Sequence, residues 1–172
     1  MKKKIIFIIP ILVIFLLVGC KLNNTPTSKV EEKISKYQKV DDSINMEELL
    51  NLLTDGDNIN SNQKDEYEKI LKKQISSLSY NIKDETQDGD EAIVKVEVTV
   101  KDFARTIKKL NQEVNKDSVG VDSYHDERIK RLKNTKDKVT YTILFEVIKD
   151  ENGNFRVNEL DSDSIRKILG IY

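Results

Sequence analysis

Apolar residues recur along this chain at two different periods, and the change between them divides it into regions. From residue 28 to about residue 78 they follow the three-to-four-residue spacing of helices, which predicts three helices. The third carries one polar residue, Gln74, within its apolar stripe. The apolar positions are Val30, Ile34 and Tyr37 in the first helix, Met46, Leu49, Leu50 and Leu53 in the second, and Tyr67, Ile70, Leu71, Ile75 and Leu78 in the third.

A period of two follows and predicts an antiparallel sheet. Tyr80 and Ile82 open a first strand, and Asp88-Gly89 is typical of a hairpin turn. Because apolar and polar residues then alternate, one face of the sheet is expected to be buried and the other wet. The predicted inward positions are Ala92, Val94, Val96, Val98 and Val100 on one strand, Val139, Tyr141, Ile143, Phe145 and Val147 on another, and Phe155 and Val157 on a short last strand after the turn at 150–154.

Helical spacing returns between two of the strands, over residues 102–136. Phe103, Ile107, Leu110 and Val114 predict one helix there, and a Gly120-containing loop leads to a short charged helix with Ile129 and Leu132. The fold class expected is α+β: N-terminal helices packed on a curved antiparallel sheet, with this helical insertion between strands. The insertion would lie at one end of the sheet, and whether it forms a lid is left open.

Short polar side chains mark where several helices are expected to begin. Thr27 or Ser28 is predicted to cap the first helix and Asn62 the third. Ser162 or Asp163 is predicted to cap a C-terminal helix that carries Ile165, Ile168 and Leu169.

The N-terminus has the three regions of a secretory signal: three lysines, an apolar run from Ile5 to Val18, and a small residue before the cut. The run is shorter than the roughly 20 residues that span a bilayer core. Leu17-Val18-Gly19-Cys20 resembles the lipobox of bacterial lipoproteins. The resemblance implies cleavage between Gly19 and Cys20, a diacylglyceryl group on the Cys20 sulfur, and acylation such as palmitate on the new N-terminus. The alternative is an ordinary signal peptide with a chance cysteine.

The predicted organisation is a signal peptide over residues 1–19, a polar tether over 20–27 and a single domain over 28–172. Cys20 is the only cysteine of the 172 residues, so lipidation would leave no thiol for redox, catalytic or metal chemistry. Lys21 provides no acidic inner-membrane retention signal, and a sequence rich in Lys, Ile and Asn favours a Gram-positive host. The expected location is the outer face of the cell membrane, held by the lipid on Cys20.

The order of the predicted elements, over roughly residues 28–160, resembles small lipoproteins of the nuclear-transport-factor-two-like, or cystatin-like, superfamily. That resemblance implies N-terminal helices packed on a bent sheet to form a cone. The insertion at 102–136 departs from the common pattern of the superfamily.

Charge and composition argue against nucleic-acid binding and give no support to carbohydrate binding. The formal net charge is −1 for the whole chain, and removal of the three signal lysines leaves the mature part near −4. Nucleic-acid binding needs a concentrated basic face, which a mixed-sign surface does not provide. Tryptophan is absent, so no stacking platform for sugars is indicated.

Metal chemistry finds little support in the sequence. His125 is the only histidine, and without a second strong ligand it is predicted to be an exposed polar residue rather than a metal ligand or base. Asp55-Gly56-Asp57-Asn58 and Asp161-Ser162-Asp163 superficially suggest calcium. Their glycine and ligand spacings do not fit a calcium loop, so turn and cap roles are preferred. No metal site and no cofactor is expected.

A basic run lies near the end of the insertion. Its members are Arg128, Lys130, Arg131, Lys133, Lys136 and Lys138. It is interpreted as a solvated helix face with Asp126 and Glu127 as partial partners, and contact with lipid headgroups or phosphate-rich wall polymers is the alternative.

Catalysis is not indicated by the inward-facing residues. Among them only Tyr80 and Tyr141 can ionise, and a tyrosine with a pKa near 10 is a poor base. The predicted function is therefore a non-catalytic, membrane-anchored binding or accessory module for a protein partner or a small apolar ligand. The alternative is an immunity or stress lipoprotein that sequesters a membrane-active peptide, and an enzyme using the cone cavity ranks last.

Overall fold

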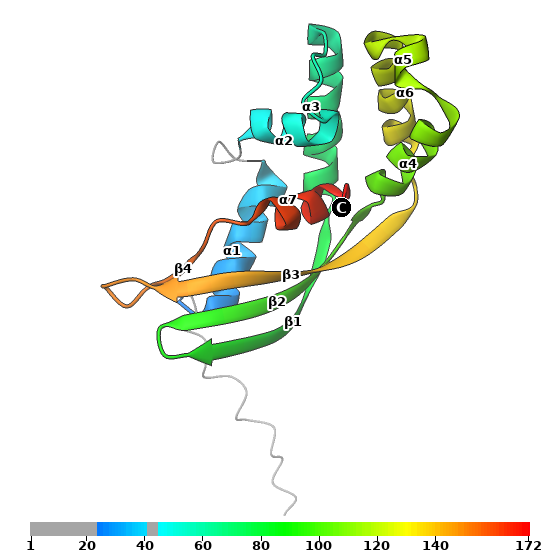
Figure 1. Cartoon of the computed structure of the whole chain (residues 1–172). Helices are drawn as coiled ribbons and strands as arrows, with labels where there is room; N and C mark the ends of the chain where they lie inside the picture. Colours follow the sequence, from blue (N-terminus) through cyan, green and yellow to red (C-terminus); the bar gives the residue numbers. More distant parts are fainter. Residues whose placement is uncertain (1–23, 41–44) are drawn as a thin grey trace, which may run out of the picture.

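The computed structural model describes residues 24–40 and 45–172, and it has the α+β architecture expected from the sequence (Figure 1). Helices precede the sheet in the chain, and a helical insertion separates its two longest strands. The elements are α1 (Pro26–Lys39), α2 (Met46–Thr54), α3 (Ser61–Ser76), β1 (Ser79–Asp88), β2 (Glu91–Lys101), α4 (Phe103–Glu113), α5 (Lys116–Val119), α6 (Val121–Asn134), β3 (Lys138–Lys149), β4 (Phe155–Val157) and α7 (Ser162–Leu169).

The sheet is an antiparallel meander in the order β1-β2-β3-β4. The inward valines of β2 lie opposite apolar residues of β3: Val94 pairs with Phe145, and Val96 pairs with Ile143. These four side chains are buried beneath the helices. The alternation read from the sequence therefore gave the correct buried face, because a register that pairs apolar with apolar residues places all of them on one side.

The sheet curves beneath the helices, which cover only one of its faces (Figure 1). A β-bulge between Ile82 and Asp84 shifts the register of β1 against β2, and bulges of this kind bend the strand that carries them. The uncovered face is mostly polar, with the exposed Ile93 and Leu144 and the half-buried Ile148 as apolar residues.

Several helices begin slightly before the predicted positions. Thr25 caps α1 instead of Thr27 or Ser28, Asn60 caps α3 instead of Asn62, and Asp161 caps α7 instead of Ser162 or Asp163. In each case a neighbouring residue of the same chemistry accepts the hydrogen bond from the backbone N–H of the third helical residue. Periodicity alone cannot choose between adjacent residues that are all able to cap.

The insertion between β2 and β3 belongs to the main core. Its base is closed by a hydrogen bond from the backbone N–H of Asp102 to the carbonyl of Asp137, 2.9 Å long. Phe103, Ile129 and Leu132 are buried in the same hydrophobic cluster as the sheet, and α6 packs against α3. Because removal of the insertion would expose this cluster, it is not a separable lid.

The first described residues already contact the domain. The side chain of Asn24 donates to the carbonyl of Gly153 and accepts from the backbone N–H of Phe155, so the start of α1 is fixed beside the β3–β4 turn. Gly19 and Cys20, with the rest of the predicted signal, lie outside the described residues. Within 24–40 and 45–172, no helix has the length and apolar character needed to cross a bilayer.

Candidate functional site

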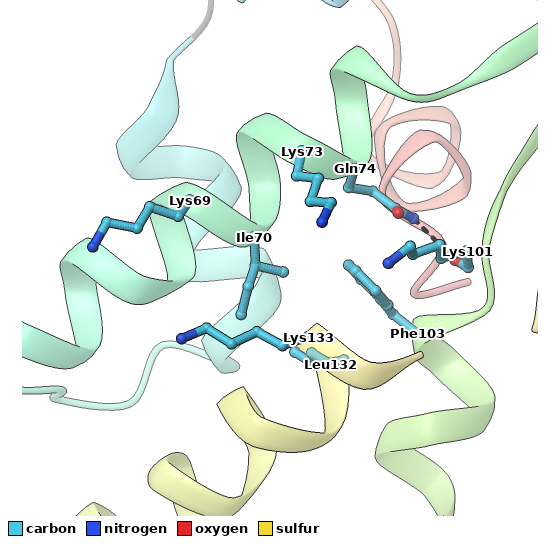
Figure 2. Close-up of a pocket in the computed structure, with 8 residues that line it drawn as sticks. All are labelled: Lys69, Ile70, Lys73, Gln74, Lys101, Phe103, Leu132 and Lys133. Atoms are coloured by element: carbon cyan, nitrogen blue, oxygen red, sulfur yellow. Dashed lines mark hydrogen bonds between the residues drawn. The ribbon is translucent and has the colours of Figure 1, made fainter. Parts of the chain in front are cut away.

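The candidate site is a pocket at one end of the interface between α3 and the insertion. We call it the lysine pocket; it is lined by Lys69, Ile70, Lys73, Gln74, Lys101, Phe103, Leu132 and Lys133. These residues come from α3, the end of β2, the start of α4 and the end of α6. Helical spacing places Ile70, Lys73 and Gln74 on one face of α3, and the insertion supplies the opposite wall (Figure 2).

Hydrocarbon forms the floor of the lysine pocket. Ile70, Phe103 and Leu132 are buried in the hydrophobic cluster, with at most 6% of their surface exposed, and all three line the cavity. The cavity has a volume of about 310 Å³, at the lower end of the range for small-molecule sites. Most of its exposed lining is apolar, so it favours a ligand with a hydrocarbon portion.

The four lysines at the rim of the pocket divide into two pairs. Lys69 and Lys133 both form ion pairs with Glu66, and these contacts lower the pKa of the Glu66 carboxyl to about 2. Lys73 and Lys101 form no ion pair with a carboxylate in the described part of the chain. In Figure 2 the ammonium groups of Lys73 and Lys101 point toward the space beside the Phe103 ring, whereas those of Lys69 and Lys133 extend away from it.

The unpaired lysines influence each other. Burial, with a further contribution from the charge of Lys73, lowers the pKa of the Lys101 ammonium group. Two like charges that face one partly apolar cavity repel each other, and an anion between them would relieve that repulsion. The pocket therefore has a local excess of positive charge on a chain whose total formal charge is −1.

Gln74 closes the inner side of the pocket. Its amide nitrogen donates to the carbonyls of Lys101 and Leu169, at 2.9 and 3.0 Å, and so joins α3 to β2 and α7. Its amide oxygen is buried, and it has no hydrogen-bond partner among the described residues. A buried acceptor left without a partner is destabilising.

The other end of the α3–α6 interface holds a second polar group, which we call the His125 cluster: Asp57, Tyr67, Lys116 and His125. His125 is fully buried, so the prediction that it is an exposed polar residue is wrong. The Tyr67 hydroxyl lies 2.7 Å from His125 Nδ1, and Asp57 Oδ2 lies 3.1 Å from His125 Nε2. With a neutral imidazole, Tyr67 donates to Nδ1 and Nε2–H donates to Asp57, which also pairs with Lys116.

The His125 cluster stabilises the fold and does not resemble a reactive site. Burial lowers the pKa of His125, and the Lys116 contact followed by the His125 hydrogen bond lowers the pKa of Asp57. Burial also raises the pKa of the Tyr67 hydroxyl. Both imidazole nitrogens are engaged, and neither His125 nor Tyr67 is exposed to solvent. The cluster therefore links the α2–α3 loop to the insertion.

The other sequence-predicted candidates have structural positions. Asp55 ends α2 and pairs with the buried Arg128 at 3.0 Å, and Asp161 caps α7. In the described ranges, no group of three or more metal-ligating side chains gathers at one place. Tyr141 donates to the terminal carbonyl of Tyr172, and Tyr80 packs at the edge of the core.

The predicted basic run does not form one continuous solvated face. Arg128 is buried, and Lys133 reaches across to Glu66 on α3. Arg131 pairs with Glu127, as predicted, and also with Glu113. Asp126 instead accepts a hydrogen bond from Gln63 of α3. These contacts connect the insertion to itself, to α3 and, through Arg128 and Asp55, to the end of α2.

Sequence reasoning did not identify the lysine pocket. Lys101 follows a strict strand alternation that assigned it to the wet face of β2, and Lys73 is one of many lysines on a polar helix face. One signal was available: Gln74 interrupts the apolar stripe of α3. A polar residue at a core position needs buried partners, and here those partners lie at the edge of the pocket.

Comparison of the chain with protein-family models, with curated proteins and with solved structures finds no match in any of the three.

Proposed function

We propose that this protein is a lipid-anchored extracytoplasmic binding protein, without catalytic activity, whose lysine pocket holds a small ligand with a hydrocarbon portion. The observation that carries the proposal is the apolar floor of Ile70, Phe103 and Leu132 beneath a cavity of about 310 Å³. Resemblance of the cluster Leu17-Val18-Gly19-Cys20 to a lipobox supports the anchor.

The position of the pocket relative to the anchor supports capture from solution. Cys20 lies four residues before Asn24, a reach of at most about 14 Å. Asn24 is bound to the β3–β4 turn, beside the hairpin end of the sheet. Lys101 lies at the opposite end of the 11-residue strand β2, roughly 30 Å away. An anchor on Cys20 would thus hold the hairpin end near the bilayer and leave the pocket in the aqueous phase.

The alternative predicted function, sequestration of a cationic membrane-active peptide, receives no support from this pocket. Such a peptide would need an apolar groove beside acidic side chains, whereas lysines surround this cavity. An enzyme using the cavity would need a nucleophile or a base there, and the titratable groups of the lining are its four lysines. We take Lys73 and Lys101 as cationic binding groups; His125 and Asp57 lie outside the lining.

Blocking the pocket tests the binding function. The full-length lipidated chain is reconstituted in phosphatidylcholine vesicles and titrated calorimetrically with octan-1-ol, octanoate and octyl phosphate, with protein-free vesicles as the blank. Lys73→Trp places a large ring over the floor and is expected to abolish binding of every ligand that the wild type binds. Lys72→Trp is the matched control, because Lys72 is the adjacent exposed residue of α3 and does not line the pocket.

The result expected is saturable binding by the wild type and by Lys72→Trp, with none by Lys73→Trp. Binding that survives in Lys73→Trp, or no saturable binding of any of the three amphiphiles by the wild type, would overturn the assignment of the pocket.

The anchor has a separate test. Replacing Cys20 by Ser or Ala removes the sulfur that forms the thioether, so the protein should no longer incorporate labelled fatty acid and should leave the membrane fraction. Label that persists in the Cys20→Ala variant would contradict lipidation at this residue.

A further inference from the structure

We propose that the ligand of the lysine pocket is an amphiphile with an anionic head and a short hydrocarbon tail, its head held between Lys73 and Lys101 and its tail on Phe103, Ile70 and Leu132. This inference rests on the proposed binding function and names the chemical class of its ligand. A carboxylate and a phosphate monoester share the chemistry that the two ammonium groups recognise.

The separation of the rim charges carries the assignment. Lys69 and Lys133 share Glu66, so a single carboxylate partly compensates their two charges within the protein. Lys73 and Lys101 lack such a partner in the described ranges, although they face the same cavity (Figure 2). Lys72, the exposed neighbour of Lys73 on α3, pairs instead with Glu68 one helical turn away. What distinguishes Lys73 and Lys101 is that both ammonium groups point toward the same apolar-floored cavity.

The surroundings strengthen attraction for an anion. Lys101 is half-buried at the end of β2, and the apolar floor excludes water from one side of its ammonium group. Ion pairs in such partly desolvated positions are stronger than those on an open surface. A neutral amphiphile would fill the floor but leave the two ammonium groups facing each other, whereas a cationic one would add a third positive charge.

Ligands that differ only in the head group test the preference. The same lipidated protein in phosphatidylcholine vesicles is titrated with octanoate, octyl phosphate, octan-1-ol and octylammonium. The wild type is expected to bind the two anions at least about tenfold more tightly than the alcohol or the amine. Their affinity should fall as the salt concentration rises, while that of octan-1-ol should not.

The second part of the experiment removes the charge of Lys73 and of Lys101 in separate variants. Lys73→Gln and Lys101→Gln are each expected to weaken octanoate binding about tenfold and to change octan-1-ol binding less than about twofold. Lys95→Gln is the matched control, because Lys95 is an exposed lysine of the same strand β2 that does not line the pocket. Circular dichroism of each variant verifies that the domain is folded.

The outcomes separate the two proposals. Equal affinity for octanoate, octan-1-ol and octylammonium would overturn the anionic head and leave the binding function intact. Absence of binding for all four would overturn the binding function and the anion preference with it.

The source of the anion is tested in the same vesicles. Phosphatidic acid that competes with octanoate, where an equal fraction of phosphatidylglycerol does not, would assign the head group to a bilayer lipid. We expect the affinity for octanoate to be the same in vesicles with phosphatidic acid and in vesicles with phosphatidylglycerol. The reason is that the pocket lies at the end of the sheet far from the tether.

Discussion

The two ends of the α3–α6 interface carry polar groups of similar kind but in opposite states. In the His125 cluster, each buried polar atom of Tyr67 and His125 has a partner, and the Asp57 carboxylate meets both an imidazole and an ammonium group. At the lysine pocket, the Gln74 amide oxygen and the Lys73 and Lys101 charges lack partners among the described residues. A satisfied network stabilises the fold. The unpaired ammonium groups of Lys73 and Lys101 remain available to an anion, whereas the buried Gln74 oxygen is an acceptor and only destabilises.

The largest expected effect is at the satisfied end. His125→Ala removes a buried ring and two hydrogen bonds, and it leaves the Tyr67 hydroxyl without its partner. We expect a loss of about 3 kcal/mol in the free energy of unfolding, measured by urea denaturation. Lys101→Ala, the comparable truncation at the pocket, should cost less than about 0.5 kcal/mol because no internal partner is lost. Equal losses in the two variants would remove the contrast between the two ends.

Gln74→Leu tests the one residue of the pocket that also supports the fold. The change removes two donors and so leaves the carbonyls of Lys101 and Leu169 unpaired, while it also removes the unpartnered amide oxygen. The expected net loss is about 1.5 kcal/mol in the urea-derived free energy of unfolding. A more stable variant would show that the unsatisfied oxygen costs more than the two donated hydrogen bonds contribute.

Acidification should weaken the satisfied end. The pKa of His125 is lowered in the folded protein, so the unfolded chain binds a proton more readily below the ordinary histidine pKa of about 6.5. Stability is therefore complete above that pH and falls as the pH decreases, by at most about 1.4 kcal/mol per pH unit from this group. Asp57, whose pKa is also lowered, adds a loss in the same direction below about pH 4.

Urea midpoints at pH 7.5 and 5.5 measure this dependence, and His125→Gln provides the comparison because it retains a polar side chain without the titration. A wild type and a variant with the same pH dependence would show that His125 does not couple folding to protonation in this range.

The smallest effect is expected at the unsatisfied end and has the opposite sign. In the wild type the charge of Lys73 contributes to the lowered pKa of Lys101. Lys73→Gln removes this repulsion. Because Lys73 is exposed, the gain in unfolding free energy should be at most a few tenths of a kcal/mol. The same variant should lose octanoate affinity. If Lys73→Gln were less stable than the wild type, Lys73 would have a stabilising partner within the protein, which would contradict its role as an unpaired ligand-binding group.

Periodicity in the sequence was sufficient for the class of the fold. Strict alternation in β2, from Ala92 to Val100, fixed the buried face of the sheet, and helical spacing located α1, α2, α3 and the insertion. Caps were displaced by one to three residues because neighbouring polar residues compete for the same backbone N–H. Periodicity and capping depend on residues that are close in sequence, so they can be predicted from the sequence alone.

Only the tertiary structure determined which polar and charged side chains contact one another. His125 occurs in a charged stretch that gives no sign of burial, and only the packing of α6 on α3 brings it to Tyr67 and Asp57, which lie 58 and 68 residues away in the chain. Lys73 and Lys101 likewise meet because Gln74 ties α3 to the end of β2. Side-chain partners distant in sequence leave no periodic trace, so the sequence specified the elements and the folded chain determined which charges have partners.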